Sequence, residues 1–291
     1  MYELQHLHGN TYFFSGPTKI GLYRLNDTDV LIIDTGIEAR VGKRILKTIT
    51  ENGWELKFII NTHAHADHVG GNAYLQGQTG CQIFANPIEA CFTEYTFLNS
   101  CFVYGAFSPK ELRKKFMLSE ESHITPLSEA QLPEGFEIID LKGHSSQMIG
   151  VRTPDDILFL ADSLASEFTI EKYKVIYTFN VEAYLETLER VRNMKARLFV
   201  PAHADVTDDI SALAEFNVKV TKDLLDTIAG FCREPISFEG LLKKIFDEFS
   251  LTMNYEQHAL IGSTIKSYLS YLTDREVLKT YFEDNILMIS V

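Results

Sequence analysis

Residues 58–71 read FIINTHAHADHVGG, an apolar run followed at once by three histidines and an aspartate. The run Phe58–Ile60 predicts a buried strand. The glycine pair after the polar cluster begins Gly70–Gly80, which we expect to form a short helix. The cluster therefore lies on a turn between a strand and a helix, where side chains from several positions converge on one small volume.

The four polar side chains of this turn form a candidate metal site. Alternation along an extended segment places His63 and His65 on the same side of the chain. The turn then presents Asp67 and His68 from another direction. Imidazole and carboxylate groups suit Zn²⁺ and, less selectively, Fe or Mn. Two directions of approach predict two divalent metal ions.

Three more polar residues follow apolar runs elsewhere in the chain. His144 follows Leu-Lys-Gly, Asp162 follows Leu-Phe-Leu-Ala, and His203 follows Leu-Phe-Val-Pro-Ala. Each is expected at the end of a strand, at the rim of a sheet, where rigid scaffolds present functional side chains. By contrast, four histidines have no partners in any pattern and are interpreted as structural or exposed: His6, His8, His123 and His258.

Strands and helices alternate repeatedly over residues 1–206, which predicts a layered α/β domain. From residue 207 the pattern becomes helical, and residues 207–291 form a second, smaller unit. Its expected order is a long helix, two shorter helices and two strands joined by Glu-Asp-Asn, the outline of a winged-helix module. Between these patterns, residues 88–122 are rich in Phe and Tyr without a clean period. They predict either helices that pack aromatic side chains into the core or an aromatic flap over the site.

The order His-x-His-x-Asp-His, Gly-His, Asp and His resembles the metallo-β-lactamase fold superfamily, including its glyoxalase II-like members. The resemblance implies a four-layer αββα sandwich with a metal site along one edge. It assigns one metal to His63, His65 and His144. It assigns the second metal to Asp67, His68 and His203, with Asp162 bridging both.

The same resemblance implies a metallo-hydrolase. A hydroxide that bridges two metals would attack the carbonyl of a small ester or thioester, and the metals would stabilise the oxyanion. Asp67 would orient the hydroxide and carry the proton to the leaving group. All seven expected ligands are present, which argues against a binding protein that has lost its catalytic site.

Several positions depart from particular branches of the superfamily. Asp162 argues against the zinc β-lactamases, which lack this aspartate, and Ala165 stands where quorum-sensing lactonases have Tyr. The segment 163–166 lacks the Cys-Gly-Arg with which glyoxalase II enzymes grasp glutathione. Residues 143–148 read GHSSQM instead of the common GHTPGH, which affects groups around the ligands rather than the ligands themselves.

Charge bears on the expected partners. The formal net charge is −13, and residues 205–291 contain fifteen Asp and Glu against eight Lys and Arg, a net of −7. Nucleic acid is therefore an unlikely partner, because its readers normally present a basic stripe. A nuclease that uses the winged-helix-like module is the second hypothesis, and an iron-dependent redox protein is the third. The module is instead expected to pack on the core, shape a small-molecule pocket or form a homodimer.

The remaining expectation concerns location. The N-terminal MYELQHLHGNTYFF has neither a basic segment nor an apolar segment of the kind found in signal peptides. No apolar run approaches the ~20 residues of a membrane span. We therefore expect a cytoplasmic protein.

Overall fold

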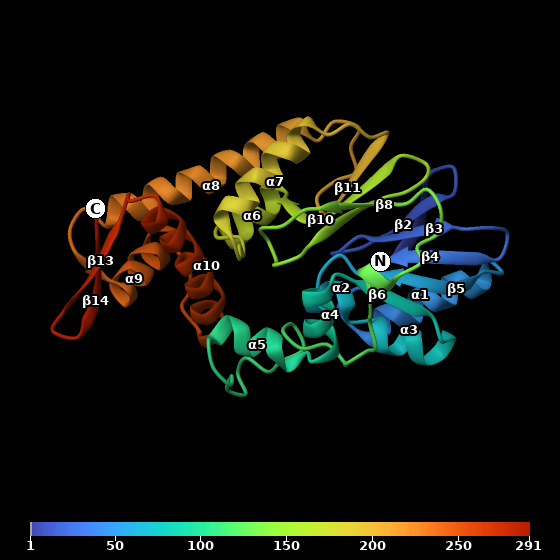
Figure 1. The fold of residues 1–291 in the computed structure, drawn as a ribbon, viewed down its shortest axis with the longest axis horizontal. Coiled ribbons are helices and arrows are strands. Elements are labelled where there is room, and N and C mark those ends of the chain that lie inside the picture. Colours follow the sequence, from blue (N-terminus) through green and yellow to red (C-terminus); the bar gives the residue numbers. More distant parts are fainter. Residues whose placement is uncertain (1) are drawn as a thin grey trace.

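Two β-sheets packed face to face form the centre of the protein in a computed structural model that describes residues 2–291 (Figure 1). The first sheet has the order β1-β2-β3-β4-β5-β6-β7. Its strands are β1 (Glu3–His8), β2 (Thr11–Ser15), β3 (Ile20–Arg24), β4 (Asp29–Ile33), β5 (Glu55–Ile60), β6 (Gln82–Ala85) and β7 (Thr125–Pro126). The second sheet has the order β11-β10-β9-β8. Its strands are β8 (Glu137–Asp140), β9 (Ile149–Arg152), β10 (Ile157–Ala165) and β11 (Leu198–His203).

Helices cover the outer face of each sheet. The first sheet is covered by α1 (Ala39–Glu51) and α3 (Asn72–Thr79), and the short α2 (Ala66–Val69) directly precedes α3. In α1, the spacing of Val41, Ile45 and Ile49 places all three on one buried face. The second sheet is covered by α7 (Val181–Asn193) and the first half of α8 (Ser211–Phe231). The predicted αββα sandwich is confirmed.

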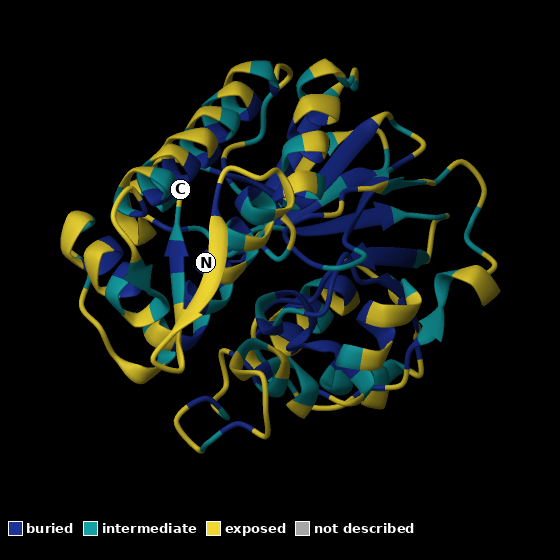
Figure 2. Cartoon of the chain, turned by 60° about the vertical axis from the view of Figure 1, so that its left-hand side comes forward, coloured by how far each residue is buried: buried dark blue, intermediate teal, exposed yellow. Residues whose placement is uncertain are grey.

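Apolar side chains from both sheets interdigitate between them. Phe13, Leu31 and Ile33 of the first sheet meet Phe159 and Val200 of the second in one buried cluster. Figure 2 shows the strands at the centre as buried, with exposed residues on the outward faces of the helices, in loops and along β13 (Lys279–Glu283). Burial on both sides explains why the strands read as continuous apolar runs rather than as alternating ones.

The aromatic segment begins with two helices. These are α4 (Pro87–Glu94) and α5 (Phe97–Tyr104), and a loop then continues to β7. Several aromatic side chains of the segment remain exposed, Phe107 and Tyr95 among them. Packing into the core therefore does not explain the aromatic composition of this segment.

The chain ends in a smaller unit built on the second half of α8. It contains β12 (Ile236–Ser237), α9 (Phe238–Glu248), α10 (Tyr255–Asp274), β13 (Lys279–Glu283) and β14 (Ile286–Ser290), and its sheet order is β12-β14-β13. The expected order of helices, strands and turn is present, and the winged-helix assignment stays a prediction. The division at residue 207 also stays a prediction. Helix α8 packs into the core of the smaller unit through Leu224 and Ile228, and into the core between the second sheet and α7 through Ala214.

Two expected strand ends differ from the structure. Asp162 lies within β10 and not at its end, because a β-bulge around Ala161 lets the strand continue to Ala165. His144 lies in a loop beyond the last residue of β8, Asp140.

Helix α6 (Glu167–Tyr173) has no buried residue and shows no periodic apolar pattern in its sequence. Within residues 2–291, no helix combines the length and the apolar character that crossing a membrane requires.

Candidate metal centre

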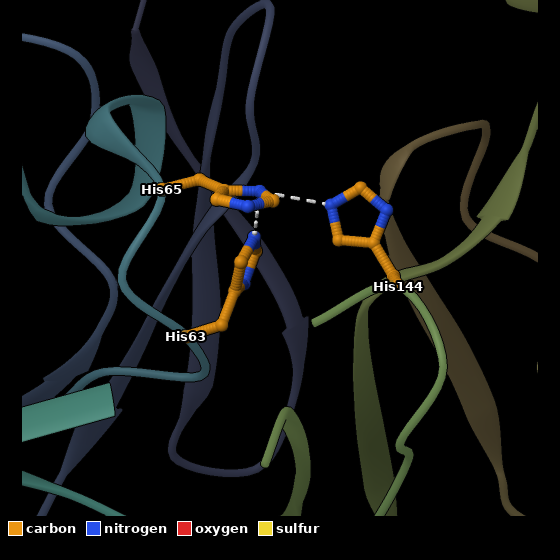
Figure 3. A group of neighbouring side chains, drawn as sticks. All are labelled: His63, His65 and His144. Atoms are coloured by element: carbon orange, nitrogen blue, oxygen red, sulfur yellow. Dashed lines mark hydrogen bonds between the residues drawn. The ribbon is translucent and has the colours of Figure 1, made fainter. Parts of the chain in front are cut away.

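Three histidine rings converge at the edge of the sandwich (Figure 3). His63 and His65 follow β5 in the first sheet, and His144 comes from the loop between β8 and β9 in the second. The His65 Nδ1 atom lies 3.0 Å from His63 Nε2 and 2.9 Å from His144 Nε2. Ring nitrogens this close together, with no carboxylate among them, are arranged as the ligands of one cation would be.

A second group lies beside the first and consists of Asp67, His68, Asp162 and His203. His68 Nε2 lies 3.0 Å from Asp162 Oδ1, and His203 Nε2 lies 3.2 Å from Asp162 Oδ2. The distance from His203 Nε2 to Asp67 Oδ2 is 3.3 Å. The two imidazoles and two carboxylates thus enclose another small volume.

Asp162 lies between the two groups. Its Oδ2 atom is 3.5 Å from His144 Nε2, a member of the first group, as well as close to His203. The bulge before it explains this position, because Ala161 has a left-handed backbone with φ of 49° and the pairing register with β11 shifts there. Bulges of this kind re-aim a side chain next to a functional site.

Asp34 orients two of the rings. Its Oδ2 atom accepts a hydrogen bond from His68 Nδ1 at 2.7 Å and from the Thr62 hydroxyl at 2.8 Å. Because that hydroxyl donates to Asp34, it accepts from His63 Nδ1 at 3.1 Å. Both histidines therefore carry a proton on Nδ1 and turn Nε2 towards the site.

Backbone carbonyls orient two other rings in the same way. His144 Nδ1 donates to the Tyr177 carbonyl at 3.0 Å, and His203 Nδ1 donates to the Pro17 carbonyl at 2.8 Å. Within residues 2–291, the buried His68 Nε2 and Asp162 Oδ1 atoms lie 3.0 Å apart but form no hydrogen bond with each other or with any other group. Buried polar atoms without partners are costly unless a ligand satisfies them. The donor set therefore fits two divalent cations.

Glu89 of α4 links the two histidine loops of the first group. Its buried carboxylate accepts from the Ala64 amide at 2.9 Å, between His63 and His65. It also accepts from the Ser145 hydroxyl and the Gln147 amide, each at 2.8 Å, just after His144. One side chain thus fixes ligand loops that come from different sheets.

The electrostatics of the histidines follow from burial and mutual contact. Burial lowers the pKa of His63 and His65, and that of His144 to about 4, so these rings are neutral near pH 7. Asp162 raises the pKa of His203 to about 10 against the opposing effect of burial. Burial alone would lower the pKa of His68, but the surrounding carboxylates hold it well above its usual value.

The two carboxylates show the complementary effect. Burial alone would raise the pKa of Asp162, but His203 and His68 hold it well below its usual range. The pKa of Asp67 is lowered in the same way by His68 and His203, again against burial. Both side chains are therefore ionised near neutral pH, the form that binds a cation.

A cavity of about 350 Å³ opens beside the two groups. His65 and Asp67 line it on the side of the candidate metal centre. Most of the remaining wall is apolar and comes from the aromatic segment, so the flap hypothesis describes this segment better than core packing does.

All seven side chains singled out in the sequence converge in these two groups. The four histidines that belong to no sequence pattern are exposed: His6, His8, His123 and His258. The sequence pattern missed Asp34 and Glu89. Asp34 had a usable signal, because it follows the apolar run of β4 as the expected ligands follow theirs. Glu89 had none, because nothing in its neighbourhood distinguishes it from a surface glutamate.

Comparison with known proteins places these features in context. A family model described as the metallo-beta-lactamase superfamily matches residues 15–203. A hydroxyacylglutathione hydrolase from Methylococcus capsulatus is 40% identical over 47 residues, 16% of this chain and 18% of that protein. Another from Erythrobacter litoralis is 28% identical over 131 residues, 44% of this chain and 42% of that protein. The matched stretches thus span less than half the length of these curated relatives.

Solved structures resemble the chain over nearly its whole length. A beta-lactamase domain protein from Burkholderia ambifaria superimposes with a TM-score of 0.74 at 15% identity, covering 99% of this chain and 94% of that one. A metallo-beta-lactamase family protein from Thermus thermophilus gives 0.68 at 16% identity, covering 98% and 97%. At these identities the likeness concerns the fold.

Proposed function

The chain belongs to the metallo-beta-lactamase superfamily, and from this premise we propose that it is a hydrolase that holds two divalent metal ions and cleaves a small ester or thioester. The observation that carries the proposal is the convergence of seven side chains from both sheets into two adjoining groups beside a cavity. The curated relatives support a hydrolase, since both of those described above are named hydroxyacylglutathione hydrolases.

The proposed ligands follow the two groups. One ion would be held by His63, His65 and His144, and the other by Asp67, His68 and His203, with Asp162 between them. The all-nitrogen and mixed nitrogen–oxygen donor sets favour zinc, although iron or manganese would also fit. Bound there, two such cations would lower the pKa of water and polarise the carbonyl of the substrate.

Asp67 is the proposed catalytic residue. It lines the cavity, and the Thr18 hydroxyl donates to its Oδ2 atom at 2.8 Å, which fixes the carboxylate. Because His68 and His203 hold its pKa low against burial, the carboxylate is available as an acceptor near pH 7. We propose that it orients the attacking water, accepts its proton and passes that proton to the leaving group.

The experiment measures metal content and turnover together. Protein purified without added metal is analysed for zinc, iron and manganese, and is then assayed on thioesters, carboxylic esters, lactones, phosphodiesters and RNA. We expect close to two zinc ions per chain and turnover of a thioester or ester. Asp67→Asn should reduce that turnover strongly, whereas Asp27→Asn, on an exposed turn, should leave it unchanged.

Other outcomes would point elsewhere. Cleavage of RNA or a phosphodiester without ester turnover would favour the nuclease. One iron per chain without any hydrolysis would contradict the proposal and favour a redox protein. The proposed function does not depend on a cytoplasmic location or on a homodimer. Both stay predictions.

A further inference from the structure

The cavity beside the metal centre has a composite wall. Phe92 of α4 and Phe102 of α5 belong to the aromatic segment, Phe179 follows α6, and Leu260 lies on α10 of the C-terminal unit. Three parts of the chain that are distant in sequence therefore enclose one space. At about 350 Å³ it lies near the lower end of small-molecule pockets, which span roughly 300–1,000 Å³.

Contacts around the cavity fix the position of α10. The Ser267 hydroxyl of α10 donates to the Phe179 carbonyl at 2.7 Å, and the Phe179 ring packs on that of Phe102 with 5.4 Å between centroids. At the other end of the helix, Glu256 pairs with Lys114 at 2.6 Å. These contacts hold α10, and with it Leu260, in place against the cavity. Figure 1 shows α10 extending from the C-terminal unit to α5.

The charge of the wall restricts what can enter. Among the residues that line the cavity within the described chain 2–291, there is no lysine or arginine. Two of the polar side chains there are already engaged: Asn99 donates to the Phe92 carbonyl, and Ser145 donates to Glu89. A substrate carboxylate or phosphate buried in this wall would meet no lysine or arginine, and burying an anion without an opposite charge costs much free energy.

Resting on the hydrolase function proposed above, we propose that the substrate carries an uncharged, apolar acyl or aryl group that occupies this cavity, and that Leu260 limits its length. The reacting carbonyl then lies at the end marked by His65 and Asp67, and the apolar group extends towards α10. The C-terminal unit is accordingly part of the substrate site. Substrates whose acyl side bears a carboxylate or phosphate are excluded by the same wall.

The first test uses a homologous series of acyl thioesters, from acetyl to decanoyl, with the metal-loaded protein. Each methylene that enters the cavity should raise kcat/KM about fourfold until the cavity is full. Leu260→Trp should lower the ratio of octanoyl to acetyl kcat/KM at least tenfold, and Leu260→Ala should move the optimum to a longer chain. Leu287→Trp, a matched change on the exposed β14, should leave the ratio unaltered.

A second test measures binding without turnover. Calorimetric titration of the protein with acetamide, hexanamide and decanamide should show affinity rising with chain length, and Leu260→Trp should remove most of the gain for the longer amides. Succinamate, which carries a carboxylate, should not bind in the cavity.

The two proposals fail in different ways. Absence of ester and thioester turnover, together with length-dependent amide binding, would overturn the hydrolase function and leave the apolar pocket. Turnover that does not depend on acyl length, or that Leu260→Trp alters no more than Leu287→Trp, would overturn the inference and leave the hydrolase function intact.

Discussion

The Glu89 carboxylate ties the His63–His65 loop to the loop that follows His144, so its removal should loosen the first group of ligands. In Glu89→Gln, an amide NH₂ group would replace one of the two accepting oxygens. It would then face an N–H or O–H donor, and two donors cannot form a hydrogen bond with each other. We expect metal affinity at this group to fall roughly 10–100-fold, as for other residues that support metal ligands. Competition with a chromophoric chelator measures it.

Glu94→Gln is the matched control for this change. Glu94 lies on the same helix, but it accepts from His123 and from the Ile124 amide and touches no proposed ligand. Its replacement should leave metal affinity unchanged. Equal losses in the two variants would mean that α4 as a whole, and not the Glu89 carboxylate, supports the site.

Protonation gives a second prediction for single residues. His203 has a pKa of about 10 in the metal-free protein, because Asp162 lies beside it, and that of His68 is also raised. His203 is therefore protonated at pH 7.5 and must lose its proton to bind a cation. Zinc uptake should release at least one proton per chain, and zinc affinity should increase with pH until the pH passes about 10.

Calorimetry in buffers of different ionisation enthalpy measures this release. In His203→Gln the number of released protons should decrease by about one. His144 should contribute none, since burial lowers its pKa to about 4. A binding enthalpy that is independent of the buffer would contradict the prediction.

Ligands and supporting residues differ in how far sequence reveals them. His63 and Asp67 fall in a dense cluster with a fixed spacing, which a single sequence displays. Glu89 acts through amides of residues that are remote in sequence, and only the packing of α4 against both loops brings them together. Its role could not be predicted before the fold was known.

Among the elements, the loop between β8 and β9 depends on a close approach to α7. Gly143 has φ of +127°, and a Cβ atom there would lie 2.3 Å from Tyr184 Cα. Gly143→Ala should therefore destabilise the protein by roughly 1–3 kcal/mol from backbone strain alone. Because His144 is the next residue, metal affinity should fall as well.

Urea denaturation of the metal-free protein measures the first effect. Gly77→Ala provides the comparison, since Gly77 lies in α3 with nothing within 4 Å of the added Cβ atom. That change should stabilise the protein by roughly 0.5–1 kcal/mol. Destabilisation of similar size in both variants would show that the approach to Tyr184 is unimportant.

Elements with strong local patterns were predicted, as the strand at Phe58–Ile60 (in β5) and the helix within Gly70–Gly80 (α3) illustrate. The continuation of β10 past Asp162 was not predicted. A bulge depends on the pairing of β10 with β11, and the sequence of β10 alone does not reveal it. No apolar pattern predicts the edge strand β1. It is exposed at most positions and has no continuous apolar run.

At the scale of the whole molecule, the proposed ligands join the two sheets. His68 lies in α2, which follows β5 of the first sheet, and Asp162 lies on β10 of the second sheet. A metal ion bound between them would link the two sheets. Removal of metal should therefore lower the melting temperature, by on the order of 10 °C when the metal is at a thousandfold excess over its Kd.

Thermal unfolding with zinc and with chelator tests this prediction. Asp162→Asn should lose most of the metal-dependent increase, because Asp162 approaches both groups of ligands. His123→Asn, on an exposed loop, should retain it. An unchanged melting temperature on chelation of the parent protein would show that metal does not link the sheets.

The distribution of ligands along the chain also bears on biosynthesis. The ribosome synthesises His63 early, whereas His203 is the last residue of β11, the last strand of the second sheet along the chain. A nascent chain cannot complete the second group of ligands until its synthesis has passed His203, and by then every strand of the first sheet has left the ribosome. Metal that occupies the second group would therefore be bound late in synthesis or after it.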